Sequence, residues 1–150
     1  PAHSPYSAKD VRDTYTAIFA ERGCEAPAVV RIYRSDANAE HFLAFGTALD
    51  GTEITAETLN GAMDGLIFEN GAAFNTVTAD KDGHIRADLN DAFAAQVRSL
   101  GTSGEYFLVG GIVNTLLDAF DGTEVMLTVN GAPLESGHNI YDYALTRYEE

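Results

Sequence analysis

Apolar residues recur along this chain with two periods, one typical of amphipathic helices and the other of half-buried strands. Extended runs rich in apolar and β-branched residues occupy 28–34, 41–49, 74–79, 84–89 and 125–129. Segments with the helical period follow four residues that can act as N-caps, namely Ser7, Thr55, Asn90 and Thr102. The order helix, strand, strand, helix, hairpin, two helices, hairpin predicts a single α+β domain, with helices packed on one face of a mostly antiparallel sheet.

Turn residues between the extended runs indicate where the chain reverses. The segment Asp80–Gly83 joins two of the predicted strands, and Gly83 can supply the positive φ that such a loop needs. Asn130 and Gly131 follow the last strongly alternating run and predict a two-residue hairpin turn. A final edge segment is expected within residues 139–148.

The predicted helices contain residues with more specific roles. Glu105 stands three positions after Thr102, which predicts a capping box at the start of the longest helix. Gly61 and Gly65 fall in one helical segment and Gly110-Gly111 in another, where each glycine costs about 1 kcal/mol relative to alanine. We therefore expect both glycine pairs to pack closely against a neighbouring element.

The composition fits one domain that buries its own core. Among 150 residues, 23 are acidic and nine are lysine or arginine, which gives a formal net charge of −14. This charge repels phosphate groups, so we expect no nucleic-acid partner. No apolar run approaches the roughly 18 residues needed to span a bilayer, so we expect no membrane insertion of this segment.

Cys24 is the single cysteine, so an intrachain disulfide cannot form.

The start of the chain suggests processing. The first residue is Pro1 and not methionine. We expect a processed or trimmed product from which an N-terminal signal or lipid anchor was removed.

Candidate catalytic and metal-binding patterns are incomplete. No serine lies in a Gly-x-Ser-x-Gly elbow, and no histidine pair has the helical spacing of a zinc site. A calcium loop aligned on Gly83 has Thr78 and Leu89 where acidic ligands are required. We expect no cofactor and no metal, and name Asp80 and Asp82 as the weak candidate ligands. A hydrolase that uses His138 or a carboxylate pair assembled by the fold remains an alternative.

The last third of the chain, residues 105–147, resembles the sporulation and spore germination domain family called GerMN. The resemblance extends loosely upstream to Ala28. The residues that carry it are Ile112–Leu116, Val125–Gly131, Pro133, Gly137-His138 and Leu145–Arg147.

This resemblance implies an α/β sandwich similar to the ring-building modules of large envelope assemblies. Residues 1–27 would form an N-terminal tail and helix, and residues 28–150 the GerMN-like domain. The implied function is a non-catalytic binding or scaffold domain, extracytoplasmic and commonly on a lipoprotein, that acts in sporulation, germination or another envelope assembly. Its partners would be envelope proteins or further copies of the chain. A glycan- or peptide-binding module is the second alternative.

Seven residues are the candidates for structural or partner contacts. Within a helix, Asn114 and Thr115 match the family's Asn-Thr pair and are expected to hydrogen-bond a neighbouring loop. We expect His138 to fix the last segment through a loop backbone, with a ligand or switch role as the alternative. The C-terminal tyrosines either cover the core edge or form a contact patch. The full set is Asn114, Thr115, Gly137, His138, Tyr141, Tyr143 and Arg147.

Overall fold

The computed structural model of the protein describes residues 27–149. The helix predicted after Ser7 and the thiol of Cys24 lie outside the described residues. The helices and two mostly antiparallel sheets confirm the α+β class. In chain order, the elements are β1 Val29–Ser35, β2 Phe42–Ala48, α2 Ala56–Met63, β3 Phe74–Ala79, β4 His84–Leu89, α3 Asp91–Arg98, α4 Thr102–Phe120, β5 Glu124–Val129, β6 Ala132–Glu135 and β7 Ile140–Tyr141.

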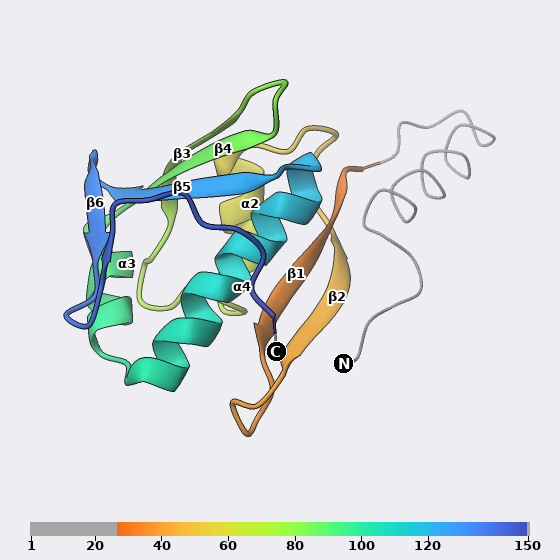
Figure 1. The fold of residues 1–150 in the computed structure, drawn as a ribbon. Helices are drawn as coiled ribbons and strands as arrows, with labels where there is room; N and C mark the ends of the chain where they lie inside the picture. The colour runs from red at the N-terminus through yellow and green to blue at the C-terminus, as the bar shows by residue number, and fades with distance from the viewer. Residues whose placement is uncertain (1–26, 150) are drawn as a thin grey trace, which may run out of the picture.

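The larger sheet has five strands in the order β3-β4-β5-β6-β7. Its neighbouring strands are antiparallel except β4 and β5, which run parallel and are connected through α3 and α4. Ile85, Ala87 and Leu89 on β4 are buried, whereas His84 and Arg86, which alternate with them, are exposed. In Figure 1, helix α3 and most of helix α4 lie below strands β3, β4 and β5. The sheet therefore has one face on the core and one face toward solvent.

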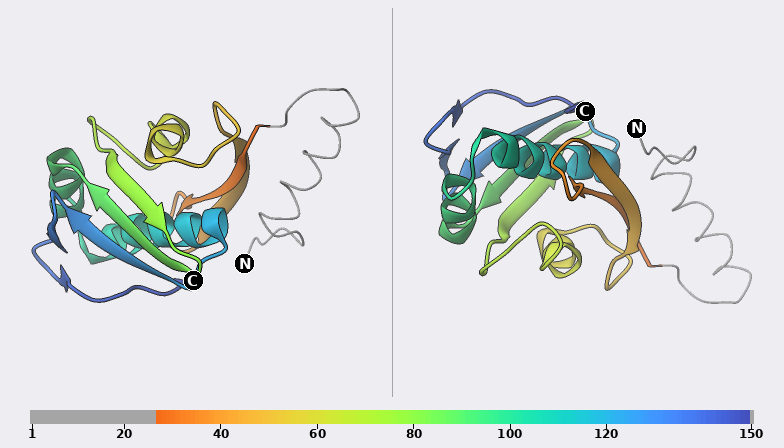
Figure 2. Two further views of the ribbon diagram at one scale, coloured as in Figure 1. Left: turned by 90° about the horizontal axis from the view of Figure 1, so that it is seen from above. Right: turned by 90° about the horizontal axis from the view of Figure 1, so that it is seen from below.

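Helix α4 is the central element of the domain. Every residue from Phe107 to Leu117 is buried, although a surface helix would bury only one stripe. The helix contacts strands β1, β4 and β5 and helix α3, and Figure 2 shows it alongside the β1–β2 hairpin from two further directions. Neighbours on several sides explain why its sequence is apolar almost all the way around.

Strand β1 meets α4 with its backbone edge. The Tyr33 amide donates a hydrogen bond to Thr115 Oγ1 at 3.1 Å, and the Thr115 hydroxyl donates to the Gly111 carbonyl at 2.6 Å. A Cβ atom on Gly111 would lie 2.6 Å from the Tyr33 carbonyl oxygen, and one on Gly110 would lie 2.6 Å from the Tyr148 ring. The close packing predicted for Gly110-Gly111 is confirmed, and α4 covers the outer edge of β1.

The same prediction is wrong for the other glycine pair. Helix α2 ends at Met63, so Gly65 lies beyond it, where its φ of 79° suits a glycine. A Cβ atom on Gly61 would meet nothing within 4 Å. Close packing thus explains the glycines at Gly110-Gly111 but not those at Gly61 and Gly65.

The predicted Asn130-Gly131 turn is confirmed, and the predicted capping box at Thr102 is wrong. Asn130 and Gly131 have φ values of 49° and 87°, as the predicted two-residue hairpin turn requires. The capping box at Thr102 is absent, because Gly101 is the N-cap of α4 and makes no side-chain cap hydrogen bond. The Glu105 carboxylate instead contacts His138 and Tyr141.

The two helical glycines provide a matched test of the β1–α4 contact. We expect Gly111→Ala to lower the free energy of unfolding by about 1–3 kcal/mol, because the new methyl group overlaps the Tyr33 carbonyl. Gly61→Ala should instead leave stability unchanged or raise it by about 0.5–1 kcal/mol, since its surroundings are open. Urea unfolding of both variants measures the difference. Equal effects at the two positions would contradict the packing described here.

Candidate functional site

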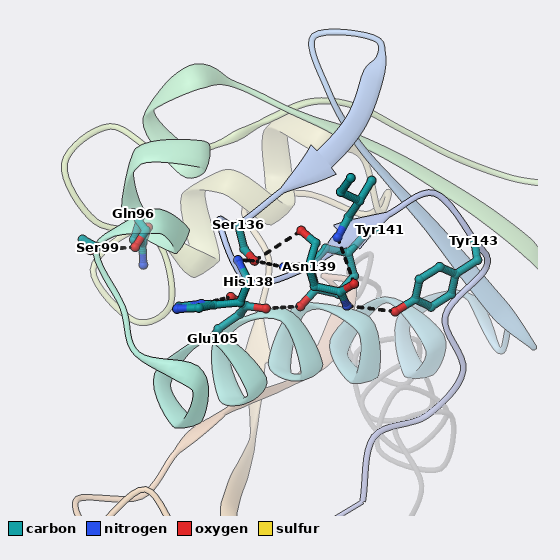
Figure 3. A network of polar contacts seen from close by, with 9 residues as sticks. Gln96, Ser99, Glu105, Ser136, His138, Asn139, Tyr141 and Tyr143 are labelled. Atoms are coloured by element: carbon teal, nitrogen blue, oxygen red, sulfur yellow. Dashed lines mark hydrogen bonds and ion pairs between the residues drawn. The ribbon is translucent and has the colours of Figure 1, made fainter.

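The candidate residues meet where the C-terminal segment, defined as residues 136–149, lies along α4. Three polar side chains of the helix, Glu105, Asn114 and Asp118, each hold a different part of this segment. Figure 3 shows the first of these contacts, with His138 and Tyr141 beside Glu105. The site is thus a line of polar contacts between one helix and the end of the chain.

Glu105 is the most buried acidic side chain of this line, with 6% of its surface exposed. One carboxylate oxygen lies 3.0 Å from His138 Nδ1, and the other accepts a hydrogen bond of 2.5 Å from the Tyr141 hydroxyl. Next to them, Ser136 Oγ accepts the backbone amides of His138 at 3.1 Å and Asn139 at 3.0 Å. These bonds fix the loop between β6 and β7 against the first turn of α4.

The contacts of Glu105 keep it ionised. Burial alone would raise the pKa of this carboxyl, but hydrogen bonding by Tyr141, Ser136 and His138 outweighs burial and holds the pKa below its ordinary value. Burial and the neighbouring Glu105 carboxylate raise the pKa of Tyr141 far above its usual value. Tyr141 therefore remains a hydrogen-bond donor at any physiological pH.

Asn114 binds the backbone near the end of the chain. Its Nδ2 donates to the Tyr148 carbonyl at 3.0 Å, and its Oδ1 accepts from the Tyr148 amide at 2.9 Å. This side-chain amide satisfies both polar groups of one residue in an irregular segment. Its sequence neighbour Thr115 points to the other side of the helix, where it binds Tyr33. The two adjacent residues thus tie α4 to two separate parts of the chain.

Asp118 joins strand β1 to the C-terminal segment. Its Oδ2 accepts a 2.5 Å hydrogen bond from the Tyr33 hydroxyl, and its Oδ1 forms an ion pair with Arg147. The Arg147 guanidinium also lies over the Tyr33 ring, 5.9 Å from its centroid. Burial acts to lower the pKa of Arg147, but the Asp118 carboxylate outweighs it and raises this pKa.

Two large side chains of the C-terminal segment are exposed beside these contacts. Ile140 is 51% exposed and Tyr143 is 46% exposed, whereas Tyr141 between them is buried. The rings of Tyr141 and Tyr143 stack with centroids 6.3 Å apart, and the Tyr143 hydroxyl accepts from Asn139 Nδ2 at 3.0 Å. Gly137, with φ of 93°, precedes them. The segment thus displays Ile140 and Tyr143 on a held backbone.

The Glu105–His138 pair has one feature of a catalytic site. A carboxylate on Nδ1 orients an imidazole so that its other nitrogen can act as a base or a ligand. The ring borders a shallow depression of about 550 Å³ that is also lined by Glu135, Asn139 and Ile140. Within residues 27–149, no nucleophile is hydrogen-bonded to His138 Nε2, and Ser136 Oγ is occupied by backbone amides.

The candidate metal ligands lie elsewhere, in the β3–β4 turn. Asp80 Oδ1 accepts the amides of Asp82 and His84, each at 2.9 Å, and the amide of His84 contributes most to lowering the Asp80 pKa. The His84 ring lies between two carboxylates, 3.3 Å from Asp80 and 3.0 Å from Glu124. Among the described residues, no group of three or more His, Cys, Asp or Glu side chains is placed to hold a metal ion. The Asp80 carboxylate stabilises a turn.

Sequence reasoning missed the partners of α4. Glu105 and Asp118 were not among the candidate residues, although their carboxylates bind His138, Tyr141 and Arg147. The available signal was a carboxylate at each of two positions of an otherwise apolar helix. Because charged side chains are rarely buried without partners, this pattern could have identified both residues.

The Glu105 contacts predict a pH dependence of stability. Since the folded pKa of Glu105 lies below its unfolded value, its contribution is complete above the unfolded pKa, near 4.5, and is lost as pH falls through the folded pKa. We expect the free energy of unfolding of the wild-type chain to fall more steeply below pH 5 than that of Glu105→Gln. Urea unfolding between about pH 3 and pH 7 measures both curves.

Other carboxylates titrate in the same range, so the difference between the two curves isolates Glu105. Glu135→Gln, at an exposed position of β6, is the matched control and should follow the wild-type curve. Parallel curves for the wild type and Glu105→Gln would contradict the assigned hydrogen bonds.

Comparisons with known proteins agree with this architecture. The chain is similar in structure to the tandem GerMN domains of the sporulation protein GerM from Bacillus subtilis, with a TM-score of 0.56 and 18% identity over 82% of this chain. It spans 45% of that tandem structure. The first GerMN domain of the same protein matches with a TM-score of 0.54 and 21% identity, over 81% of this chain and 95% of that domain. At these identities the likeness shows the fold.

No curated protein matches the chain closely enough to count as a relative. No helix within the described residues is long and apolar enough to cross a membrane.

The sequence matches a known family. The profile of the Germane family, described as sporulation and spore germination, matches residues 27–135. The chain therefore belongs to the sporulation and spore germination family of GerMN domains.

Proposed function

We propose that this domain is a non-catalytic binding or scaffold module of a bacterial cell-envelope protein. The observation that carries this proposal is the use of its polar groups. Glu105, Asn114 and Asp118 are directed at the chain's own C-terminal segment, so the groups that an enzyme would present to a substrate stabilise the fold.

The surface that this network holds in place is suited to a protein partner. Ile140 and Tyr143 are exposed on a segment whose neighbouring side chains, Tyr141 and Leu145, are buried. A tyrosine held by its neighbours loses little conformational freedom on binding, and aromatic residues often dominate the energy of an interface. We place the partner contact on this pair. The partner would be another envelope protein or a second copy of the chain.

The family supports the biological setting. Members are described by sporulation and spore germination, and the structures compared above belong to a sporulation protein. We extend this setting to the present chain and propose a location outside the cytoplasm, with a lipoprotein anchor preceding the domain. Cell fractionation with and without globomycin, which blocks lipoprotein signal cleavage, tests that placement. A protein confined to the cytoplasm would contradict it.

A hydrolase is the second candidate, because of the orientation of His138. Its Nδ1 contacts the buried Glu105 carboxylate at 3.0 Å, and its ring borders the depression on the surface. Such an enzyme would release soluble fragments from an envelope substrate, and His138→Ala would stop the release. A glycan-binding module would instead raise the melting temperature when peptidoglycan fragments are added, without release.

Photocrosslinking in the native host tests the proposed contact. We expect Tyr143→p-benzoylphenylalanine to form a discrete protein adduct, because the replacement keeps an aromatic ring on the exposed part of the segment. Arg86→p-benzoylphenylalanine, on the solvent face of β4, is the matched control and should form none. Adding Ile140→Ser should reduce the Tyr143 adduct without changing the melting temperature.

Two results would contradict the proposal. One is the absence of an adduct at position 143 in cells that produce the folded protein. The other is the release of peptidoglycan fragments by the purified wild-type chain but not by His138→Ala. The second result would establish the hydrolase instead.

A further inference from the structure

The β1–β2 hairpin has two edges, and α4 covers the one on β1. The Tyr33 amide points to Thr115 and away from β2, so Tyr33 and Ala44 opposite it form a non-hydrogen-bonded pair. Two backbone hydrogen bonds at the ends of the hairpin agree, since the Leu49 amide donates to the Ala28 carbonyl at 2.7 Å and the Asp36 amide to the His41 carbonyl at 2.9 Å. By alternation, the residues whose amides and carbonyls face away from β1 are Phe42, Ala44, Gly46 and Ala48.

We refer to these outward backbone groups of β2 as the β2 edge. No described strand other than β1 pairs with β2. The strand reads FLAFGTA, without charge or proline, and its register with β1 contains no bulge. Proteins usually protect an open edge with one of these features. The β2 edge is therefore suited to accept a further strand.

A polar cleft of about 690 Å³ begins where the β2 edge ends. Ala48, the last residue of β2, lines it together with the loop to α2 and the first turns of that helix. The cleft contains the carboxylates of Asp50, Glu53 and Glu57, and none of the described residues that line it is basic. The hairpin's arginines, Arg31 and Arg34, lie on β1 opposite Gly46 and Leu43, farther from this end. A positive charge is favoured at the Ala48 end of the edge.

We propose that the β2 edge binds an extended segment of a partner protein, with an uncharged β-forming stretch along β2 and a lysine or arginine in the acidic cleft. This inference rests on the proposed binding function and specifies one surface and the chemistry of its partner. Backbone hydrogen bonds supply the pairing, and the basic side chain fixes direction and register. The chain's own charge of −14 favours a basic partner over a second copy of itself.

Synthetic peptides added to the full chain test this inference. The probes are blocked Val-Thr-Val-Thr-Val peptides with lysine at the first or the last position, for antiparallel or parallel pairing, and their glutamate counterparts. We expect one lysine peptide to slow amide exchange at Phe42, Ala44, Gly46 and Ala48, but not at Phe45, which faces β1. Replacing its lysine by glutamate should weaken binding about tenfold at low salt, with a smaller difference at high salt.

A pair of variants at one position separates backbone from side-chain effects. Ala44→Pro removes one outward amide and leaves the hydrogen bonds to β1 in place, so it should weaken peptide binding at least about tenfold. Ala44→Thr retains the amide and should bind as the wild type does. Circular dichroism and thermal unfolding establish that both variants are folded. If Ala44→Pro does not fold, Gly46→Pro and Gly46→Thr provide the same comparison.

Each of four results would overturn the inference. They are unchanged amide exchange with every peptide, equal binding of lysine and glutamate peptides, unaltered binding by a folded proline variant, and slow exchange of the four amides in the free chain. The last would mean that the chain itself already covers the edge. If any occurs while the Tyr143 adduct forms, the scaffold function stands and only the β2 edge is excluded. If the Tyr143 adduct is also absent, both the scaffold function and the β2-edge inference are excluded.

Discussion

The structure depends on the approach of the β1 backbone to α4. At Gly111, the Tyr33 carbonyl occupies the space of a side chain, and the Tyr33 amide is bound by Thr115. This contact brings a strand edge directly onto a helix, which satisfies the buried Tyr33 amide and leaves no room for a larger residue at position 111. Because α4 takes the β1 edge, the only other edge of the hairpin is that of β2. One packing constraint thus decides which edge of the hairpin lies away from α4.

The same helix also organises the end of the chain. Its apolar positions pack against β1 and the five-stranded sheet, while Glu105, Asn114 and Asp118 contact the C-terminal segment. Buried polar groups with satisfied hydrogen bonds specify one arrangement, whereas apolar contacts alone would tolerate several. The segment therefore has a defined path, and Ile140 and Tyr143 have fixed positions on the surface. In the scaffold function that we propose, the acidic and histidine side chains contribute to shape and not to chemistry.

Much of the fold, but less of the site, could be predicted from the sequence. Alternation located the β3–β4 hairpin and the Asn130-Gly131 turn because those signals are local. The spacing of Thr102 and Glu105 predicts a capping box, because local spacing is the only signal in that part of the sequence. It cannot reveal that Glu105 binds His138, a partner more than 30 residues away in the chain. Gly61 and Gly111 gave the same helical signal, yet only Gly111 has a backbone carbonyl against it. These differences depend on tertiary contacts.

The proposed function requires that the α4 contacts serve a scaffold and not catalysis. This requirement is tested most directly by the activity of His138→Gln in the host, measured against the melting temperature of the purified variant. The readout is rescue of the phenotype of a strain that lacks the protein. We expect rescue to fall only as far as stability falls, and to return at a lower growth temperature. A variant with the wild-type melting temperature that fails to rescue at every temperature would contradict it.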